Sequence, residues 1–318
     1  MGALSAERQF GSSRLPLGDA CPCVSPRTMP SCPIHPVALA ADIEHLAVAI
    51  GERHGGRPQA WAAAEAWAMA RFAALGWAGR REPLPQAPER ANIIAERPGA
   101  DGTWVVLGAH LDTVPRGPGA DDNASGVAAV LALAEAWAKQ PLHGAGLRCV
   151  LFADEELMAR DRALGGSWHH AAGCQARGER IRLALILDTL AYRDQRPGTQ
   201  HWPCWWMRIV HGSRGDRVVV QADWSDRGPA RDVLRLLRRS GVLSTGWWWP
   251  GHRWQLKGDQ ASFVAHGFPV VALTDGDRFR NPHYHRSSDL PATLDVAWLA
   301  ATVAAVATAL DQFIAPES

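Results

Sequence analysis

Residues 103–126 read TWVVLGAHLDTVPRGPGADDNASG, and their pattern decides the fold that we predict. The apolar run Trp104–Gly108 has the length and composition of a buried strand. The polar residues His110 and Asp112 follow it, and a loop rich in glycine and proline comes next. Helical periodicity then extends over Ser125–Lys139. Strand, loop and helix in this order predict one unit of an α/β sheet.

The same alternation continues on both sides of this stretch. Further short apolar runs predict buried strands over Asn92–Ala95, Arg148–Ala153, Leu183–Leu187 and Val270–Leu273. Helical patterns lie over Ala230–Arg239, Gln260–Ala265 and Leu294–Phe313. Because alternating strands and helices fold into sheets covered on both sides, we expect a three-layer α/β fold. Its centre would be a mixed, largely parallel sheet with helices on both faces.

The chain of 318 residues is predicted to form one domain behind an N-terminal extension. Residues 1–37 are rich in proline, serine, glycine and cysteine and lack apolar periodicity, as is typical of disorder. Two helical patterns, one through Ile43 and one over Pro58–Leu75, open the folded part. Neither a linker nor an internal repeat divides residues 38–318, which favours a single domain.

Composition makes several partners and environments improbable. The 33 Lys and Arg residues nearly balance 32 Asp and Glu residues, so no net positive field attracts nucleic acid or an anionic membrane. The sequence shows neither an uncharged apolar stretch of about 18 residues nor a signal-peptide core, so we expect a cytoplasmic protein without a membrane partner. Six scattered cysteines do not form a disulfide framework.

Acidic and imidazole side chains follow four predicted strands and open one predicted helix. In open α/β sheets, ligands bind where the carboxyl ends of the strands meet. The residues expected at that edge are His110, Asp122, Glu155, Glu156, Asp188 and His285. Taken singly, a helix N-cap explains Asp122, and a solvated helix start explains Glu155 and Glu156. Their shared position at one edge favours a functional site instead.

The residue types in this set indicate metal chemistry. Imidazole nitrogens and carboxylate oxygens are the usual ligands of Zn²⁺ in proteins. Two histidines and three carboxylates exceed the needs of one tetrahedral ion, so we expect two Zn²⁺ ions per chain. Two such ions can share a bridging carboxylate and activate a water molecule. Glu155 then remains beside the ligands as a candidate general base.

Five short motifs carry these residues. They are GAHLDTV at 108–114, GADDNASG at 119–126, FADEEL at 152–157, LD at 187–188 and NPHYH at 281–285. With their order and spacing, they resemble the M28 family of di-zinc metallopeptidases. The resemblance covers the chain from about residue 40 to the C-terminus. It implies a zinc-exopeptidase-like fold in which residues 38–318 form the catalytic domain.

The resemblance also implies a role for each candidate ligand. Asp122 would bridge the two zinc ions. His110 and Asp188 would complete the site of one ion. Glu156 and His285 would complete the site of the other.

Three more residues acquire roles from the same resemblance. Asp112 would orient the ring of His110 from behind. Glu155 would act first as the general base and then as the acid. Tyr284 would donate a hydrogen bond to the oxyanion of the tetrahedral intermediate. The sequence departs from the family where a Ser-Asp-His triplet is often found, because residues 258–260 read Gly-Asp-Gln.

The function implied is that of a zinc-dependent exopeptidase that hydrolyses peptides with a metal-bridging water. Carboxylates at the metal edge could hold a free N-terminal amine, which favours an aminopeptidase, while a carboxypeptidase stays open. A glutaminyl-cyclase-like acyl transferase, with a similar fold and one zinc ion, is one alternative. A non-catalytic binding protein on this scaffold is the other, although the complete ligand set and Glu155 speak against it. Motifs of serine hydrolases and P-loop enzymes are not present.

Tryptophan is the anomaly of the composition, with 15 residues against 2 Tyr and 7 Phe. Trp247, Trp248 and Trp249 stand close to Gly246 and Pro250, in a segment that we expect to be a loop. Burial in the core would explain them. The sharper hypothesis is an aromatic pocket that sets the substrate preference of the site.

Overall fold

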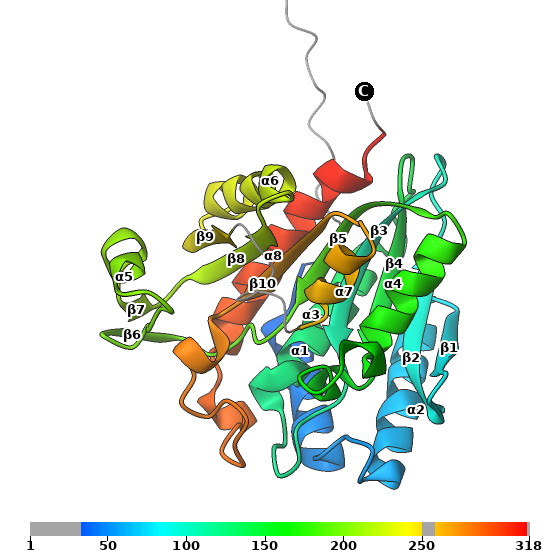
Figure 1. Cartoon of the computed structure of the whole chain (residues 1–318), viewed down its shortest axis with the longest axis horizontal. Helices are drawn as coiled ribbons and strands as arrows, with labels where there is room; N and C mark the ends of the chain where they lie inside the picture. The colour runs from blue at the N-terminus through cyan, green and yellow to red at the C-terminus, as the bar shows by residue number, and fades with distance from the viewer. Residues whose placement is uncertain (1–32, 250–257, 317–318) are drawn as a thin grey trace, which may run out of the picture.

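The computed structural model describes residues 33–249 and 258–316 (Figure 1). The strands of its central sheet are β1 (Gly79–Leu84), β2 (Ala87–Arg97), β3 (Thr103–His110), β4 (Gly146–Phe152), β5 (Arg180–Leu187), β8 (Val218–Asp223), β9 (Ser244–Trp249) and β10 (Val270–Thr274). They lie in the order β1-β2-β4-β3-β5-β10-β8-β9. A separate small sheet pairs β6 (Asp194–Pro197) with β7 (Arg214–Gly215).

The centre of the sheet is parallel and its margins are mixed. β4, β3, β5 and β10 are parallel neighbours. β2 joins β4 antiparallel, β8 joins β10 antiparallel, and β9 follows β8 in parallel. Every residue of β4 and β10 is buried, as expected of strands covered on both faces. This arrangement confirms the predicted mixed, largely parallel sheet.

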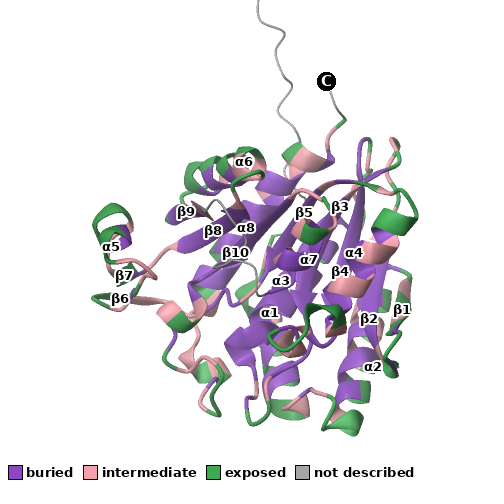
Figure 2. Cartoon of the chain, viewed as in Figure 1, coloured by how far each residue is buried: buried purple, intermediate pink, exposed green. Residues whose placement is uncertain are grey.

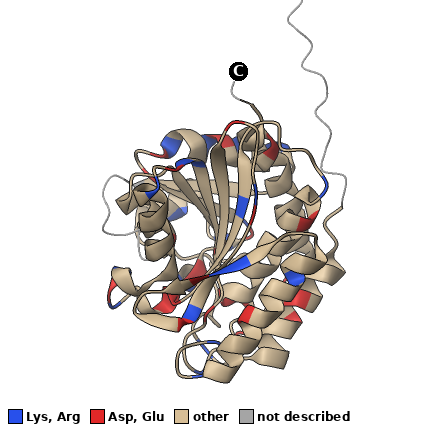
Figure 3. Ribbon diagram, turned by 90° about the vertical axis from the view of Figure 1, so that its right-hand side faces the viewer, with Lys and Arg blue, Asp and Glu red and all other residues tan. Residues whose placement is uncertain are grey.

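Helices cover both faces of the sheet and form the outer layers (Figure 2). One face packs against α1 (Pro36–Glu44), α2 (Pro58–Ala74), α3 (Gly126–Trp137), α6 (Arg227–Arg239) and α8 (Val296–Ile314). The other face packs against α4 (Gly166–Ala176) and α7 (Gln260–Ala265). α5 (Trp205–His211) lies with β6 and β7 at the left end of the view in Figure 1. Basic and acidic residues are spread over the helices and loops (Figure 3).

Short helical turns connect these elements. They cover His45–Ile50, Ala120–Ser125, Glu155–Leu157, Arg162–Leu164, Asp277–Phe279 and Pro291–Thr293. Two of these turns carry candidate site residues: Asp122 lies in Ala120–Ser125, and Glu155 and Glu156 lie in Glu155–Leu157. The turns therefore set the direction of the side chains at the carboxyl edge of the sheet.

In the described part of the chain, α8 is the one helix that is long and apolar enough to span a membrane. It contacts α1, α3 and α6, and most of its apolar window is buried inside the molecule. A buried position accounts for its apolar composition without a membrane.

One expectation from the sequence needs correction. The segment with Trp247, Trp248 and Trp249 is not a loop but β9, which pairs in parallel with β8. Aromatic residues favour strands, and this preference outweighs the nearby glycine and proline. The predicted extension, residues 1–37, lies mostly outside the described residues, although α1 already begins at Pro36.

A buried arginine ties the N-terminal helices to the loops after β3. The side chain of Arg53 is inaccessible to solvent. Its guanidinium donates to the carbonyl oxygens of Leu46, Gly51, Leu111, Pro118 and Gly119, at 2.8–3.3 Å. Burial lowers the pKa of Arg53 to about 10, so the group remains protonated at neutral pH.

We expect Arg53→Met to lower the free energy of unfolding by about 3 kcal/mol, because buried carbonyl groups lose their donor. Urea denaturation of the purified protein measures the change. Arg57→Met is the matched control, since the Arg57 side chain is 61% exposed. Equal stability of the two variants would show that the Arg53 contacts contribute nothing.

Candidate active site

The carboxyl ends of three adjacent strands carry the candidate residues. β3 ends at His110, β4 is followed by Glu155 and Glu156, and β5 is followed by Asp188. Because these strands are parallel neighbours, their ends meet at one edge. The loop after β10 brings Tyr284 and His285 to the same place. A cavity of about 330 Å³ opens there and is lined by Glu155, Glu156, Asp188, Tyr284 and His285 among others.

His110, Asp122 and Asp188 form a first cluster of potential ligands. The Nε2 atom of His110 lies 3.1 Å from Oδ1 of Asp122 and 3.4 Å from Oδ1 of Asp188. One ligand atom of each residue lies within 4.8 Å of the others. Such spacing suits groups that converge on one cation.

His285, Asp122 and Glu156 form a second cluster. The Nε2 atom of His285 lies 3.1 Å from Oδ2 of Asp122 and 3.3 Å from Oε2 of Glu156. Asp122 therefore belongs to both clusters and offers a different oxygen to each imidazole. The structure thus brings together all five residues expected as ligands. Their binding of metal stays a prediction.

The chemistry of these groups fits metal ions. Among the described residues, Oδ2 of Asp122 and Oδ1 of Asp188 are buried without a hydrogen-bond partner. Burial, with the charge of Asp122 adding to it, raises the pKa of Glu156 to about 7. Burial also raises the pKa of Glu155 well above its usual range. Divalent cations would use the free oxygens and offset this crowded negative charge.

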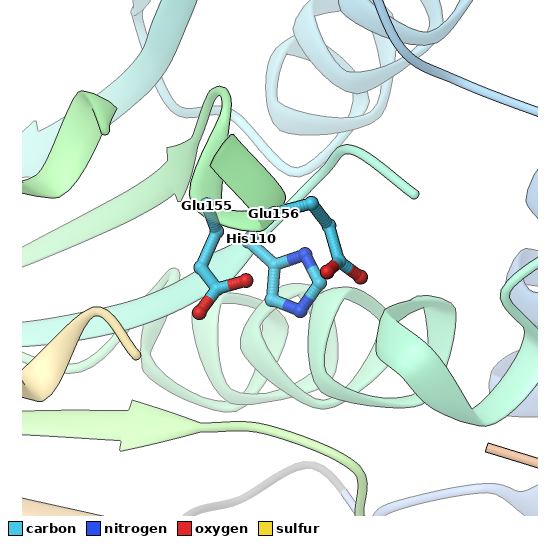
Figure 4. Close-up of side chains that lie close together, drawn as sticks. All are labelled: His110, Glu155 and Glu156. Atoms are coloured by element: carbon cyan, nitrogen blue, oxygen red, sulfur yellow. The ribbon is translucent and has the colours of Figure 1, made fainter. Parts of the chain in front are cut away.

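Asp112 supports both sides of the site from behind. Its two carboxylate oxygens accept the backbone N–H groups of Glu155 and Glu156, each at 3.0 Å. Its Oδ1 lies 3.5 Å from Nδ1 of His110, and its carbonyl oxygen lies 3.1 Å from the same nitrogen. Figure 4 shows the result, in which the carboxylates of Glu155 and Glu156 lie on either side of the His110 ring. The sequence predicted a contact of Asp112 with the His110 ring. The structure adds hydrogen bonds from the backbone of Glu155 and Glu156.

The loop that carries Asp122 is held by residues that sequence reasoning missed. Asp289 is buried, and its oxygens accept the backbone N–H groups of Asp121 and Asp122 at 2.9 and 3.1 Å. Asn281 donates to Oδ2 of Asp121 at 2.7 Å. Asp289 stands in the polar run after His285, where nothing in the spacing distinguishes it from a solvated residue.

Tyr284 and Trp247 form part of the cavity wall. The Tyr284 ring stacks on the ring of His285, with centroids 3.9 Å apart. Burial raises the pKa of Tyr284 well above its usual range, so its hydroxyl remains a donor. Trp248 instead faces α6, where it lines a different cavity with Arg231, while the side chain of Trp249 lies outside the described residues. Only the first tryptophan of the run thus faces the candidate site among the side chains described.

Comparison with known proteins identifies the family. The profile of peptidase family M28 matches residues 92–212. The uncharacterised protein YfbL of Escherichia coli is 32% identical over 241 residues, which cover 72% of each chain. The chain belongs to peptidase family M28. It is a metallopeptidase, a hydrolase that acts on peptide bonds.

Other relatives of this M28 peptidase include named enzymes. The probable lipoprotein aminopeptidase LpqL of Mycobacterium tuberculosis is 27% identical over 71% of this chain, which spans 46% of LpqL. Among solved structures, the LapA aminopeptidase of Legionella pneumophila gives a TM-score of 0.72 at 18% identity, covering 89% of this chain and 73% of LapA. The glutaminyl cyclase of Fimbriiglobus ruber gives 0.65 at 19% identity, covering 89% and 96%. At such identities these structures show the shared fold.

We expect Asp112→Asn in this M28 peptidase to weaken zinc binding and activity 10- to 100-fold. In the wild type, the backbone N–H groups of Glu155 and Glu156 donate to the two carboxylate oxygens of Asp112. The asparagine amide would place its own NH₂ group opposite one of them, and this hydrogen bond would be lost. Zinc titration with a chelator and peptidase assays measure both effects. Asp161→Asn is the control, because the Asp161 side chain accepts the N–H of Ala163, two residues on, in an exposed turn. Equal zinc affinity and activity in the two variants would show that Asp112 does not support the site.

Proposed function

We propose that this M28 peptidase is a zinc-dependent aminopeptidase with two metal ions per chain. One observation carries the proposal: two clusters of ligand groups share Asp122, and each of its oxygens faces one imidazole. A single ion would leave one of these clusters without a cation. Zinc ions held there would polarise the substrate carbonyl and lower the pKa of water.

Side chains of the protein would carry out proton transfer and stabilise the developing negative charge. Glu155 lines the cavity beside the ligands and takes the proton of the attacking water, which it delivers to the leaving amine. Its raised pKa favours this exchange, because it makes the Glu155 carboxylate a stronger base than an ordinary glutamate. The Tyr284 hydroxyl offers a hydrogen bond to the carbonyl oxygen as negative charge develops. Asp112 holds the backbone of Glu155 and Glu156 in place.

The preference for a free amino terminus rests on two supports. Glu155, Glu156 and Asp188 place carboxylates on the cavity wall, so a cationic amine is attracted there. LpqL is described as a probable aminopeptidase, and LapA as an aminopeptidase. The assay compares leucine p-nitroanilide with its N-acetyl derivative and with a C-terminal substrate. Cleavage of the acetylated or the C-terminal substrate at an equal rate would contradict an aminopeptidase.

A glutaminyl cyclase is the second candidate. The fold of this chain resembles that of the Fimbriiglobus ruber glutaminyl cyclase about as well as it resembles the folds of other solved structures. Such an enzyme closes an N-terminal glutamine instead of cleaving the next peptide bond. Incubation with a glutaminyl peptide separates the two by mass: loss of ammonia indicates cyclisation, and release of glutamine indicates hydrolysis.

We expect Glu155→Gln to lower kcat by about 10²- to 10⁴-fold with little change in KM, because the amide cannot take a proton. Zinc content should stay at two ions per chain. Glu156→Gln should instead lose zinc, since Glu156 belongs to the second cluster. Steady-state kinetics and metal analysis of both variants decide the matter. An active Glu155→Gln enzyme, or one that loses zinc while Glu156→Gln keeps it, would reverse the assignment.

A further inference from the structure

The cavity continues beyond the candidate metal residues along one face of the sheet. Ala272 on β10, Gln221 on β8 and Trp247 on β9 are successive cross-strand partners, so they form a row on that face. All of them line the cavity. Phe279 lies over this row, and its ring is 6.2 Å from that of Trp247 in an edge arrangement. The far part of the cavity therefore has an aromatic wall and an amide on its floor.

Asp277 brings an additional carboxylate into this space. It lies in the turn after β10, lines the cavity, and belongs to none of the metal clusters. Its Oδ1 atom is buried and has no hydrogen-bond partner among the described residues. A buried acceptor without a donor is unfavourable, so a donor group of a ligand in the cavity would stabilise this oxygen.

The backbone around Asp277 fixes the direction of this side chain. Its N–H donates to Oδ1 of Asp275 at 3.0 Å, and its carbonyl accepts the N–H groups of Arg280 and Asn281 at 2.9 and 2.8 Å. Asp277 also has a positive φ of 44°, in the left-handed region that few residues other than glycine adopt. The turn is thus held in a conformation that the chain does not adopt by default.

Asp277 and Arg278 both line the pocket, and Arg278 is exposed at its rim. Burial raises the pKa of Asp277 to about 7 against the opposing effect of Arg278, and Asp188 adds to the rise. The guanidinium of Arg278 lies over the Phe279 ring, 4.8 Å from its centroid, at the exposed rim. An aromatic wall beside a carboxylate with one unpartnered oxygen suits a positively charged group with an apolar stem.

We propose that this pocket receives the side chain of an N-terminal lysine or arginine of the substrate, with Asp277 paired to its cationic end. This inference rests on the proposed aminopeptidase function. The peptide bond must lie near Glu155, so the first side chain is the part of the substrate that can extend towards Trp247 and Phe279. Their rings would pack against its methylene groups, and Gln221 would accept a further hydrogen bond.

The test compares lysyl and norleucyl p-nitroanilide, which differ chiefly in the charged amine of the side chain. We expect wild-type kcat/KM to favour lysine about tenfold or more, as for a charged hydrogen bond. Asp277→Asn should abolish this preference and leave the norleucyl rate within about twofold. Asp277→Arg should turn the preference towards glutamyl p-nitroanilide. Asp232→Asn, in an exposed ion pair on α6, should keep the wild-type ratio.

Two results would overturn the proposal. A wild-type preference for norleucyl p-nitroanilide is one. The other is an equal loss of kcat/KM for both substrates in Asp277→Asn, because the carboxylate would then bind the α-amine or stabilise the turn. Calorimetry of zinc-loaded protein with free lysine and norleucine tests the pocket without turnover. In one outcome the protein cleaves no aminoacyl substrate and still binds lysine at least tenfold tighter than norleucine. If Asp277→Asn then removes this difference, the aminopeptidase function is wrong and the lysine pocket is confirmed. Equal binding of both amino acids rejects the pocket.

Discussion

Negative charge buried at the carboxyl edge of the sheet is the constraint on which the rest of this M28 peptidase depends. Asp122, Glu155, Glu156 and Asp188 lie close together, where a low dielectric makes their repulsion costly. The imidazoles of the site offset only part of it. Burial alone lowers the pKa of His285, but the neighbouring carboxylates of Asp122 and Glu156 outweigh it and raise the pKa to about 10. Divalent cations offer the larger compensation, and the donor groups are those that zinc prefers.

A second group of carboxylates makes this crowding tolerable by holding the backbone rigid. Asp112 accepts two N–H groups from the loop after β4, and Asp289 accepts two from the loop before α3. Asp121 accepts the N–H of Ala191 in the loop after β5. Each carboxylate therefore joins loops that are distant in sequence. Because the hydrogen bonds go to backbone groups, the ligand side chains remain free to face the centre of the site.

The sequence predicted those features that follow from local pattern. Apolar runs marked the central strands, and polar residues after them marked His110, Glu156 and Asp188, since the ends of parallel strands meet by construction. It did not predict Asp289 or Arg53, because their partners are backbone groups of other loops, which leave no trace in composition. The positions of Trp247 and Trp248 were only partly predictable from the sequence. Once it is recognised as a strand, alternation alone places Trp247 and Trp248 on opposite faces.

Two neighbouring acidic residues show how structural and ligand-facing carboxylates differ here. Asp275 is fully buried, and its oxygens accept the N–H groups of Tyr192 and Asp277 at 2.9 and 3.0 Å. Asp277, two residues on, lines the cavity and leaves Oδ1 without a donor among the described residues. The first carboxylate therefore stabilises the turn and the second depends on it. Oδ2 of Asp122 and Oδ1 of Asp188 likewise accept no hydrogen bond from the described residues, although an imidazole nitrogen lies 3.1 and 3.4 Å away. At this edge of the sheet, satisfied carboxylates build the framework, and the unsatisfied oxygens mark where cations of metal or substrate would bind.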